Sequence, residues 1–211
     1  MKFDIITIFP KILDSYFGES ILKRAQFKKL ITIKSHNLRD FALDKHRKVD
    51  DSPYGGGPGM VLKADVIDRA INKIRLKNKK NKSRVILFSL RGKKFDSSVA
   101  RRLSKYNQLI LICGRYEGVD ERVAKYIADE EISIGDFVLS GGELAAGIIV
   151  DSVSRFIPGV LGKLESLEEI KGSYKVYTKP EVVKIAGKKH VVPKVLLSGD
   201  HKKIEEWRQN G

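Results

Sequence analysis

The sequence is short of acidic residues and has almost no cysteine. Asp and Glu total 26 against 41 Lys and Arg among 211 residues, which leaves a formal net charge of +15. A deficit of negative charge on this scale favours a polyanionic partner such as a nucleic acid, and a Lys-rich composition with no binding role is the alternative. The single cysteine, Cys113, excludes an intramolecular disulfide and a cysteine-based metal cluster.

The sequence also lacks long apolar runs. No stretch approaches the roughly 18 apolar residues of a membrane-spanning helix, and the segment MKFDIITIFP has no basic stretch followed by a long apolar one. We therefore expect no membrane association and a cytoplasmic protein. His36, His190 and His201 show no metal-ligand spacing, so no metal ligand is assigned.

What is present is an alternation of apolar strands with amphipathic helices. Hydrophobic patterning predicts strands at residues 3–9, 30–38, 84–89, 108–113 and 131–134. It predicts helices at residues 10–27, 64–76, 96–106, 120–127 and 141–156, and a long loop at 45–59. This order is typical of an α/β fold with one open, mostly parallel sheet and helices on both faces.

The composition changes after Gly162. Residues 1–162 are expected to form one domain, residues 163–189 a polar, Lys-rich interdomain linker, and residues 190–211 a short carboxyl-terminal segment with a capped helix at 198–208. Six basic residues at 75–84 form either a solvated loop or a binding surface.

Three predicted strands are followed by unusual loops. They are SLRG at 89–92, GRYEG at 114–118 and GDFVLSGGE at 135–143. Ligands of open α/β sheets bind beyond the carboxyl ends of the strands, and glycine lets a backbone approach a ligand closely. None of the loops is a phosphate-binding motif. Either the glycines only make tight turns, or the loops bind a ligand, for which carboxylates among glycines favour a cation.

Five long segments are more specific than any single loop. They are FDIITIFP at the start, DSPYGGGPGMV at 51–61, ICGRYEGVDERV at 112–123, ISIGDFVLSGGELA at 132–145 and DSVSRFIPGVLG at 151–162. In this order they resemble the bacterial tRNA (guanine-N1)-methyltransferases that modify position 37, which belong to the knotted SPOUT class. The resemblance covers residues 1 to about 162.

This resemblance implies a deep trefoil knot that holds S-adenosylmethionine, and methyl transfer to N1 of guanine 37 in the tRNA anticodon loop. It also implies an obligate homodimer in which each site contains residues of both subunits. The cofactor residues that it implies are Ser89, Leu90, Arg91, Gly114, Arg115, Tyr116, Glu117, Gly118, Ser133, Ile134, Gly135, Asp136, Phe137, Val138, Leu139, Gly141 and Gly142.

Methylation of guanine N1 requires a base for the N1 proton and a cation or donor beside O6. In the family an arginine of the DSVSRF motif takes the second role, which here is Arg155; without the motif, Arg155 is explained as a favourable charge at a helix carboxyl terminus. A gapless alignment puts Ile170 at the position of the usual catalytic Asp, and isoleucine cannot accept a proton. Glu169 is the expected replacement, with Glu168 next.

His46, Asp50 and Gly59 are expected to contact the target base together with Arg155. A role of Asp50 in positioning Mg²⁺ is an alternative. The simpler explanation is a polar loop without a function. The carboxyl-terminal domain is expected to be truncated relative to the family, which leaves the lysine runs to supply phosphate contacts.

Two functional classes remain open. The first is an active tRNA (guanine-N1)-methyltransferase, and the second is a cofactor- or RNA-binding relative that has lost catalysis or changed its target, because of Ile170 and the short tail. A nucleotide-phosphate enzyme is disfavoured because the sequence has no phosphate-binding lysine motif.

Overall fold

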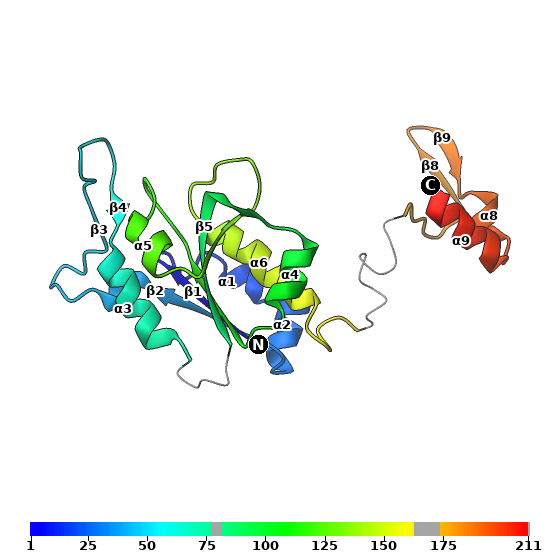
Figure 1. Cartoon of the computed structure of the whole chain (residues 1–211). Helices are drawn as coiled ribbons and strands as arrows, with labels where there is room; N and C mark the ends of the chain where they lie inside the picture. Colours follow the sequence, from blue (N-terminus) through cyan, green and yellow to red (C-terminus); the bar gives the residue numbers. More distant parts are fainter. Residues whose placement is uncertain (77–81, 163–173, 211) are drawn as a thin grey trace. The chain divides into compact units, whose positions relative to one another are not determined.

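The computed structural model describes residues 1–76, 82–162 and 174–210. The chain divides into two compact units, residues 1–162 and residues 163–211 (Figure 1). Glu168, Glu169 and Ile170 lie outside the described residues, as does part of the basic run at 75–84. No helix among the described residues is long and apolar enough to cross a membrane.

The first unit is organised around a five-stranded sheet. Its strands lie in the order β2-β1-β6-β5-β7, and every neighbouring pair is parallel. Their bounds are β1 Lys2–Thr7, β2 Thr32–Asn37, β5 Ser83–Lys94, β6 Gln108–Ile112 and β7 Glu130–Ser133. The predicted α/β fold with a mostly parallel sheet is therefore confirmed.

Helices cover both faces of this sheet. One face carries α1 Asp14–Phe17, α2 Ser20–Phe27, α4 Ser97–Leu103 and α6 Glu143–Arg155. The other carries the 3-10 helix η1 Leu38–Phe41 with α3 Ala64–Ile74 and α5 Glu121–Tyr126. Both faces are buried, which explains why the central strands are nearly continuous apolar runs.

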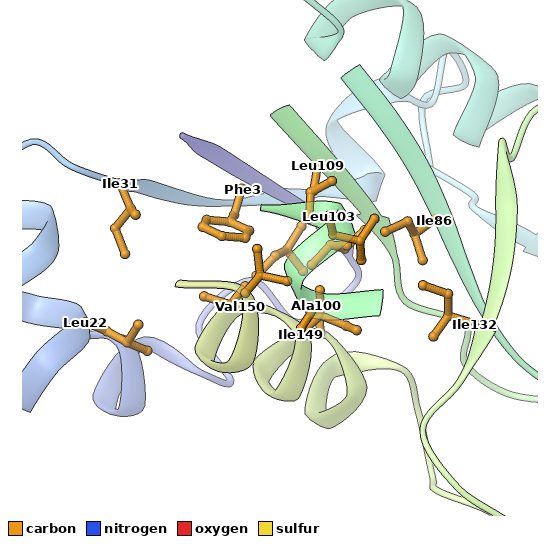
Figure 2. Packing of buried hydrophobic residues seen from close by; sticks show 14 of the residues in the cluster. Phe3, Leu22, Ile31, Ile86, Ala100, Leu103, Leu109, Ile132, Ile149 and Val150 are labelled. Atoms are coloured by element: carbon orange, nitrogen blue, oxygen red, sulfur yellow. The ribbon is translucent and has the colours of Figure 1, made fainter. Parts of the chain in front are cut away.

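Side chains alternate between the two cores along each strand. Phe3 of β1 and Leu109 of β6 point toward α6, where Ile149 and Val150 meet them (Figure 2). Ile110 belongs to the opposite core with α3. This period of two residues is the geometry of a strand.

One polar group is fully buried in β1. Burial alone would raise the pKa of Asp4, but hydrogen bonds with His36 Nε2 at 2.7 Å and Gln108 Nε2 at 2.6 Å, together with Lys2, hold it below its usual value. The carboxylate ties β1 to both of its neighbouring strands.

Three predicted elements differ from the structure. The predicted helix at 10–27 is two helices, because the chain reverses at Gly18 and Ser20 adopts a φ of 51°. The predicted loop at 45–59 contains β3 Asp50–Asp51, which pairs with β4 Val61–Leu62. Strand β5 continues five residues past the predicted end at Ser89, to Lys94.

The second unit begins its described part at residue 174. An antiparallel hairpin of β8 Val182–Ile185 and β9 Lys188–Val191 precedes α8 Lys194–Leu197 and α9 His201–Asn210. The hairpin lies mostly inside the segment predicted as a linker. Ala186 and Gly187 both have positive φ, at 49° and 79°, so they form a two-residue turn without the usual Asn-Gly or Asp-Gly signal.

Candidate functional site

A cavity of about 470 Å³ lies at the carboxyl ends of β6 and β7 and beside the middle of β5. Its volume is within the range of about 300–1,000 Å³ that is usual for small-ligand sites. All of the predicted cofactor residues except Asp136 line it. Three loops that lie apart in the sequence, at 89–92, 114–118 and 135–143, therefore meet around one space.

The first wall comes from a bulge in β5. Phe88 and Lys93 both pair with Ile132 of β7, so Ser89–Gly92 between them is left out of the ladder. A Cβ at Gly92 would lie 2.6 Å from the backbone of Glu131 and Ile132. Glycine is therefore required where the bulged strand returns to its partner.

The second wall is the loop that follows β6. Tyr116 and Gly118 have positive φ, at 60° and 122°, and the Gly118 N–H donates to Arg115 O at 3.0 Å. The N–H of Gly142 donates to Gly114 O at 3.0 Å, and a Cβ at Gly142 would lie 2.7 Å from the Cα of Cys113. Close contact between this loop and the start of α6 thus depends on a glycine.

The third wall follows β7. Ser133 is buried, and its hydroxyl donates to Gly135 O at 3.1 Å, while Phe137 packs across Gly135. Asp136 does not line the cavity: its side chain is 87% exposed and pairs with Lys94 at 2.7 Å. The predicted cofactor role of Asp136 stays a prediction, for a side chain that lies outside the cavity lining.

A buried carboxylate connects these walls. Glu143, in the first turn of α6, accepts hydrogen bonds from Thr7 Oγ1 at 2.6 Å and from Arg115 Nε at 3.1 Å, and its side chain is 2% exposed. Arg115 also donates to Ser140 O at 3.1 Å, and its guanidinium lies 4.8 Å from the ring centroid of Phe9. One acid thus fixes the end of β1, the loop after β6 and the start of α6.

The cavity is rich in carboxylates. Glu117, Glu121 and Glu131 line it, and Glu121 pairs with Arg91 at 2.7 Å. The Oε2 atom of Glu131 is buried and has no hydrogen-bond partner among the described residues. A buried acceptor without a partner is costly, so a donor or cation on a ligand would stabilise it. This favours a cationic or hydroxyl-bearing ligand.

Cys113 is adjacent to the cavity but is chemically inert. It is buried directly after β6, and burial, followed by the charge of Glu143, raises the pKa of its thiol well above the usual value. A protonated, inaccessible thiol is a poor nucleophile.

The predicted substrate residues lie outside the cavity lining. His46 is exposed in a turn, where its backbone N–H donates to Asp44 Oδ1 at 3.0 Å, and Asp50 belongs to β3. Gly59 has a φ of 79°, and a Cβ there would collide with the side chain of Glu117. The structure therefore brings Gly59 to the cavity rim but does not bring His46 to it.

Arg155 lies at the far end of α6 from the cavity. The helix spans Glu143–Arg155, so about 18 Å of helix axis separates the two residues. Arg155 is partly buried and forms no ion pair with another described residue. Within one subunit it is therefore too distant to act beside the three loops.

Thr7, Glu121, Glu131 and Glu143 were not predicted as site residues. Glu143 had a signal in the sequence, an acid at the start of an apolar helix directly after two glycines. Glu131 follows Glu130 at the start of a strand, and nothing in the sequence distinguishes the two acids. In the structure Glu130 pairs with Arg84 and Arg102, whereas Glu131 lines the cavity.

No group of three or more His, Cys, Asp or Glu side chains suited to holding a metal ion occurs in the described parts of the chain. Asp50 is therefore not part of such a group in the described residues.

Comparison with known proteins adds an independent finding. The family described as tRNA (Guanine-1)-methyltransferase TrmD matches residues 1–211. A tRNA (guanine-N(1)-)-methyltransferase of Geotalea uraniireducens is 50% identical over 99% of this chain and 84% of its own length. Proteins of the same name from Dehalococcoides mccartyi strain BAV1 and Carboxydothermus hydrogenoformans are 49% and 50% identical, over 84% and 81% of their lengths.

We predict that Glu143→Ala lowers the free energy of unfolding by about 3 kcal/mol, because it leaves the largely buried Arg115 guanidinium without its counter-charge. Urea unfolding followed by far-UV circular dichroism at fixed protein concentration measures this. Glu19→Ala is the matched control, since Glu19 is 76% exposed and its ion pair is 3.9 Å long; it should change stability by less than about 0.5 kcal/mol. Equal small effects of both substitutions would contradict the assignment.

Proposed function

This chain belongs to the tRNA (guanine-1)-methyltransferase family, and from this premise we propose that it transfers a methyl group from S-adenosylmethionine to N1 of guanine 37 in the tRNA anticodon loop. The observation that carries the proposal is the convergence of the three glycine-containing loops on one carboxylate-rich cavity. The alternative of an impaired or retargeted relative is not favoured, because half of the residues are identical to proteins named for this activity.

The cavity fits the proposed methyl donor in charge and in backbone character. A sulfonium and an amino group are cations, which suits Glu117, Glu121 and Glu131. The backbone of the segments 89–91, 114–118 and 134–139 would bind the adenine and the methionine portion. S-adenosylmethionine, when bound there, supplies an electrophilic methyl group.

Two side chains of this chain would act on the guanine. Removal of the N1 proton spreads negative charge onto O6, so a guanidinium placed there stabilises the transition state. Arg155 takes this role in the proposal. Glu169 is the proposed base for the N1 proton, with Glu168 next, and both lie outside the described residues.

We propose that the active form is a homodimer. Leu144 and Ile148 are 59% and 41% exposed on the face of α6 that also carries Arg155, at spacings of four and seven residues. Phe9, Ile12 and Tyr16 are also about half exposed, and Tyr16 donates to Asp151 Oδ2 of α6 at 3.2 Å. In the proposed dimer a second copy covers these apolar side chains, and Arg155 acts at the partner's cavity.

We also propose that the chain is knotted. Strand β7 lies at one edge of the sheet. After it the chain continues into α6, which packs on α4 and on β1, near the middle of the sheet. On the way Gly142 bonds to Gly114 of the loop after β6. A return of this kind past an earlier loop supports the trefoil knot of the SPOUT class.

The net charge of +15 supports tRNA as the partner, at a salt-sensitive affinity. The cytoplasm is the proposed site of action. Asp50 is the proposed contact for any Mg²⁺ ion; Mg²⁺ needs only one or two carboxylates when waters and phosphates complete its shell. His46, Asp50 and Gly59 remain the proposed contacts to the target nucleotide.

The first test is methyl transfer itself. With labelled S-adenosylmethionine and unmodified tRNA, we expect incorporation at guanine 37, identified as 1-methylguanosine by nuclease digestion and mass spectrometry. A tRNA with adenine at position 37 is the control and should remain unlabelled. Cofactor binding without incorporation into any tRNA would overturn the proposed activity and support the impaired relative.

The second test concerns the base. Glu169→Gln should lower kcat at least about 100-fold, because general-base catalysis typically contributes a factor of 10² to 10⁴. Cofactor affinity should remain within twofold, since the substitution removes only a charge near the acceptor. Glu168→Gln is the matched control and should retain activity; the reverse pattern would assign the base to Glu168.

The third test asks which subunit supplies Arg155 to each active site. Arg155→Ala and the cavity variant Glu117→Ala should each be inactive as homodimers. A mixed dimer of the two retains one complete site if Arg155 acts on the partner's cavity, so about half of the wild-type rate should return. A mixed dimer that is as inactive as its parents would show that Arg155 acts within its own subunit.

A further inference from the structure

Tyr54 is the most exposed aromatic side chain among the described residues, ahead of Phe27 at 89%. Tyr54 is 102% exposed, whereas Tyr116 and Tyr126 are 51% and 70% exposed. A tyrosine with no buried surface contributes nothing to the core, and its large ring is a hydrophobic cost in water. A ring of this kind is explained most simply by a ligand that covers it.

Tyr54 stands on a defined arm. The arm comprises residues 50–62, from β3 to β4, and projects beyond the neighbouring α5 in Figure 1. Gly55, Gly56, Gly57 and Gly59 follow Tyr54, all with positive φ, so they turn the chain back toward β4. Pro53 precedes the tyrosine and restricts the backbone, which lowers the entropy cost of fixing the ring in a complex.

The arm is attached directly to the cavity wall. Glu117 N–H donates to Met60 O and Leu62 N–H donates to Gly118 O, both at 3.0 Å, and Leu62 forms a bridge with Val119. Tyr54 is three residues beyond Asp51, so the two Cα atoms are at most about 11 Å apart. Asp51 pairs with Val61, which lies between Met60 and Leu62, the two residues that bond to the wall. The arm thus carries the ring near enough to the wall to contact a nucleotide adjacent to one that enters the cavity.

The surroundings favour a polyanion over an apolar protein surface. Lys45, Arg47 and Lys48 are exposed on the segment that leads into the arm. Arg122, which pairs with Asp120 at 2.6 Å, is exposed at the start of α5. Cations around an exposed aromatic ring are the usual combination in sites for single-stranded nucleic acids, where the ring stacks on a base and the cations contact phosphates.

We infer that Tyr54 stacks on an unpaired base next to the target guanine and holds the anticodon loop open over the cavity. This inference rests on the proposed function and assigns a positioning residue to it. Stacking does not require a particular base, so Tyr54 would contribute affinity and placement while sequence choice comes from other contacts.

The experiment uses the full-length protein and the unmodified tRNA. Tyr54→Ala should weaken tRNA binding about 5- to 150-fold, the range measured when a stacking aromatic is removed. Tyr54→Phe should restore binding to within about twofold, because the ring and not the hydroxyl makes the contact. The affinity for S-adenosylmethionine and the melting temperature should remain unchanged, since the ring touches neither the cavity nor the core.

Two further measurements separate stacking from other roles. The slope of log Kd against log salt should be the same for Tyr54→Ala and wild type, because no phosphate contact is lost. A tRNA with 2-aminopurine beside guanine 37 should show fluorescence quenching with wild type and Tyr54→Phe but not with Tyr54→Ala. Tyr126→Ala is the matched control, an exposed tyrosine on α5 whose loss should change none of these quantities.

The outcomes distinguish this inference from the proposed function. If wild type methylates guanine 37 and Tyr54→Ala binds tRNA equally well, the inference is wrong and the function stands. If Tyr54→Ala instead changes the oligomeric state in analytical ultracentrifugation, the ring is a subunit contact and the inference is also overturned. If wild type neither binds nor methylates tRNA, the proposed function itself fails.

Discussion

The buried carboxylate of Glu143 is the constraint on which the cavity depends. It bonds to Thr7 at the end of β1 and to Arg115 in the loop after β6, and it begins the helix that covers the sheet. A carboxylate in the first turn of a helix is also favoured by the helix dipole. Three segments from distant parts of the chain are thereby held at fixed separations, and Gly142 allows their backbones to approach closely.

The two ends of helix α6 lie in different surroundings. Its first turn closes the cavity through Glu143, while its last residue, Arg155, lies about 18 Å away on a face with exposed apolar side chains. The proposed second copy of the chain explains both features. It would cover the exposed apolar face, and its cavity would receive the Arg155 that is too far from the cavity of its own chain. In the proposed function, the distribution of residues along this one helix connects assembly to catalysis.

Much of the fold could be predicted from the sequence because the core strands are apolar on both faces and the helices are amphipathic. The prediction was least successful where local backbone geometry decides the structure. The bulge at Ser89–Gly92 depends on pairing with β7, and the β8-β9 turn uses Ala186 and Gly187, which carry no strong turn signal.

Glycine-containing segments after predicted strands marked the three loops, because glycine allows backbone to approach a ligand or another loop closely, and the individual cofactor residues came from the family resemblance. Side chains whose role depends on being buried in the folded protein were harder to identify from the sequence. Asp136 lies within such a motif but points to Lys94 at the surface, and Glu131 could not be told from Glu130, because only the tertiary structure decides which acid meets an arginine.

The central claim is that three loops at the end of one parallel sheet form a site for a methyl donor. Calorimetric titration of the folded protein with S-adenosylmethionine tests it most directly. The account predicts saturable binding that is lost when Glu117 is replaced by alanine. Absence of measurable heat or saturation, with both S-adenosylmethionine and S-adenosylhomocysteine, would contradict it.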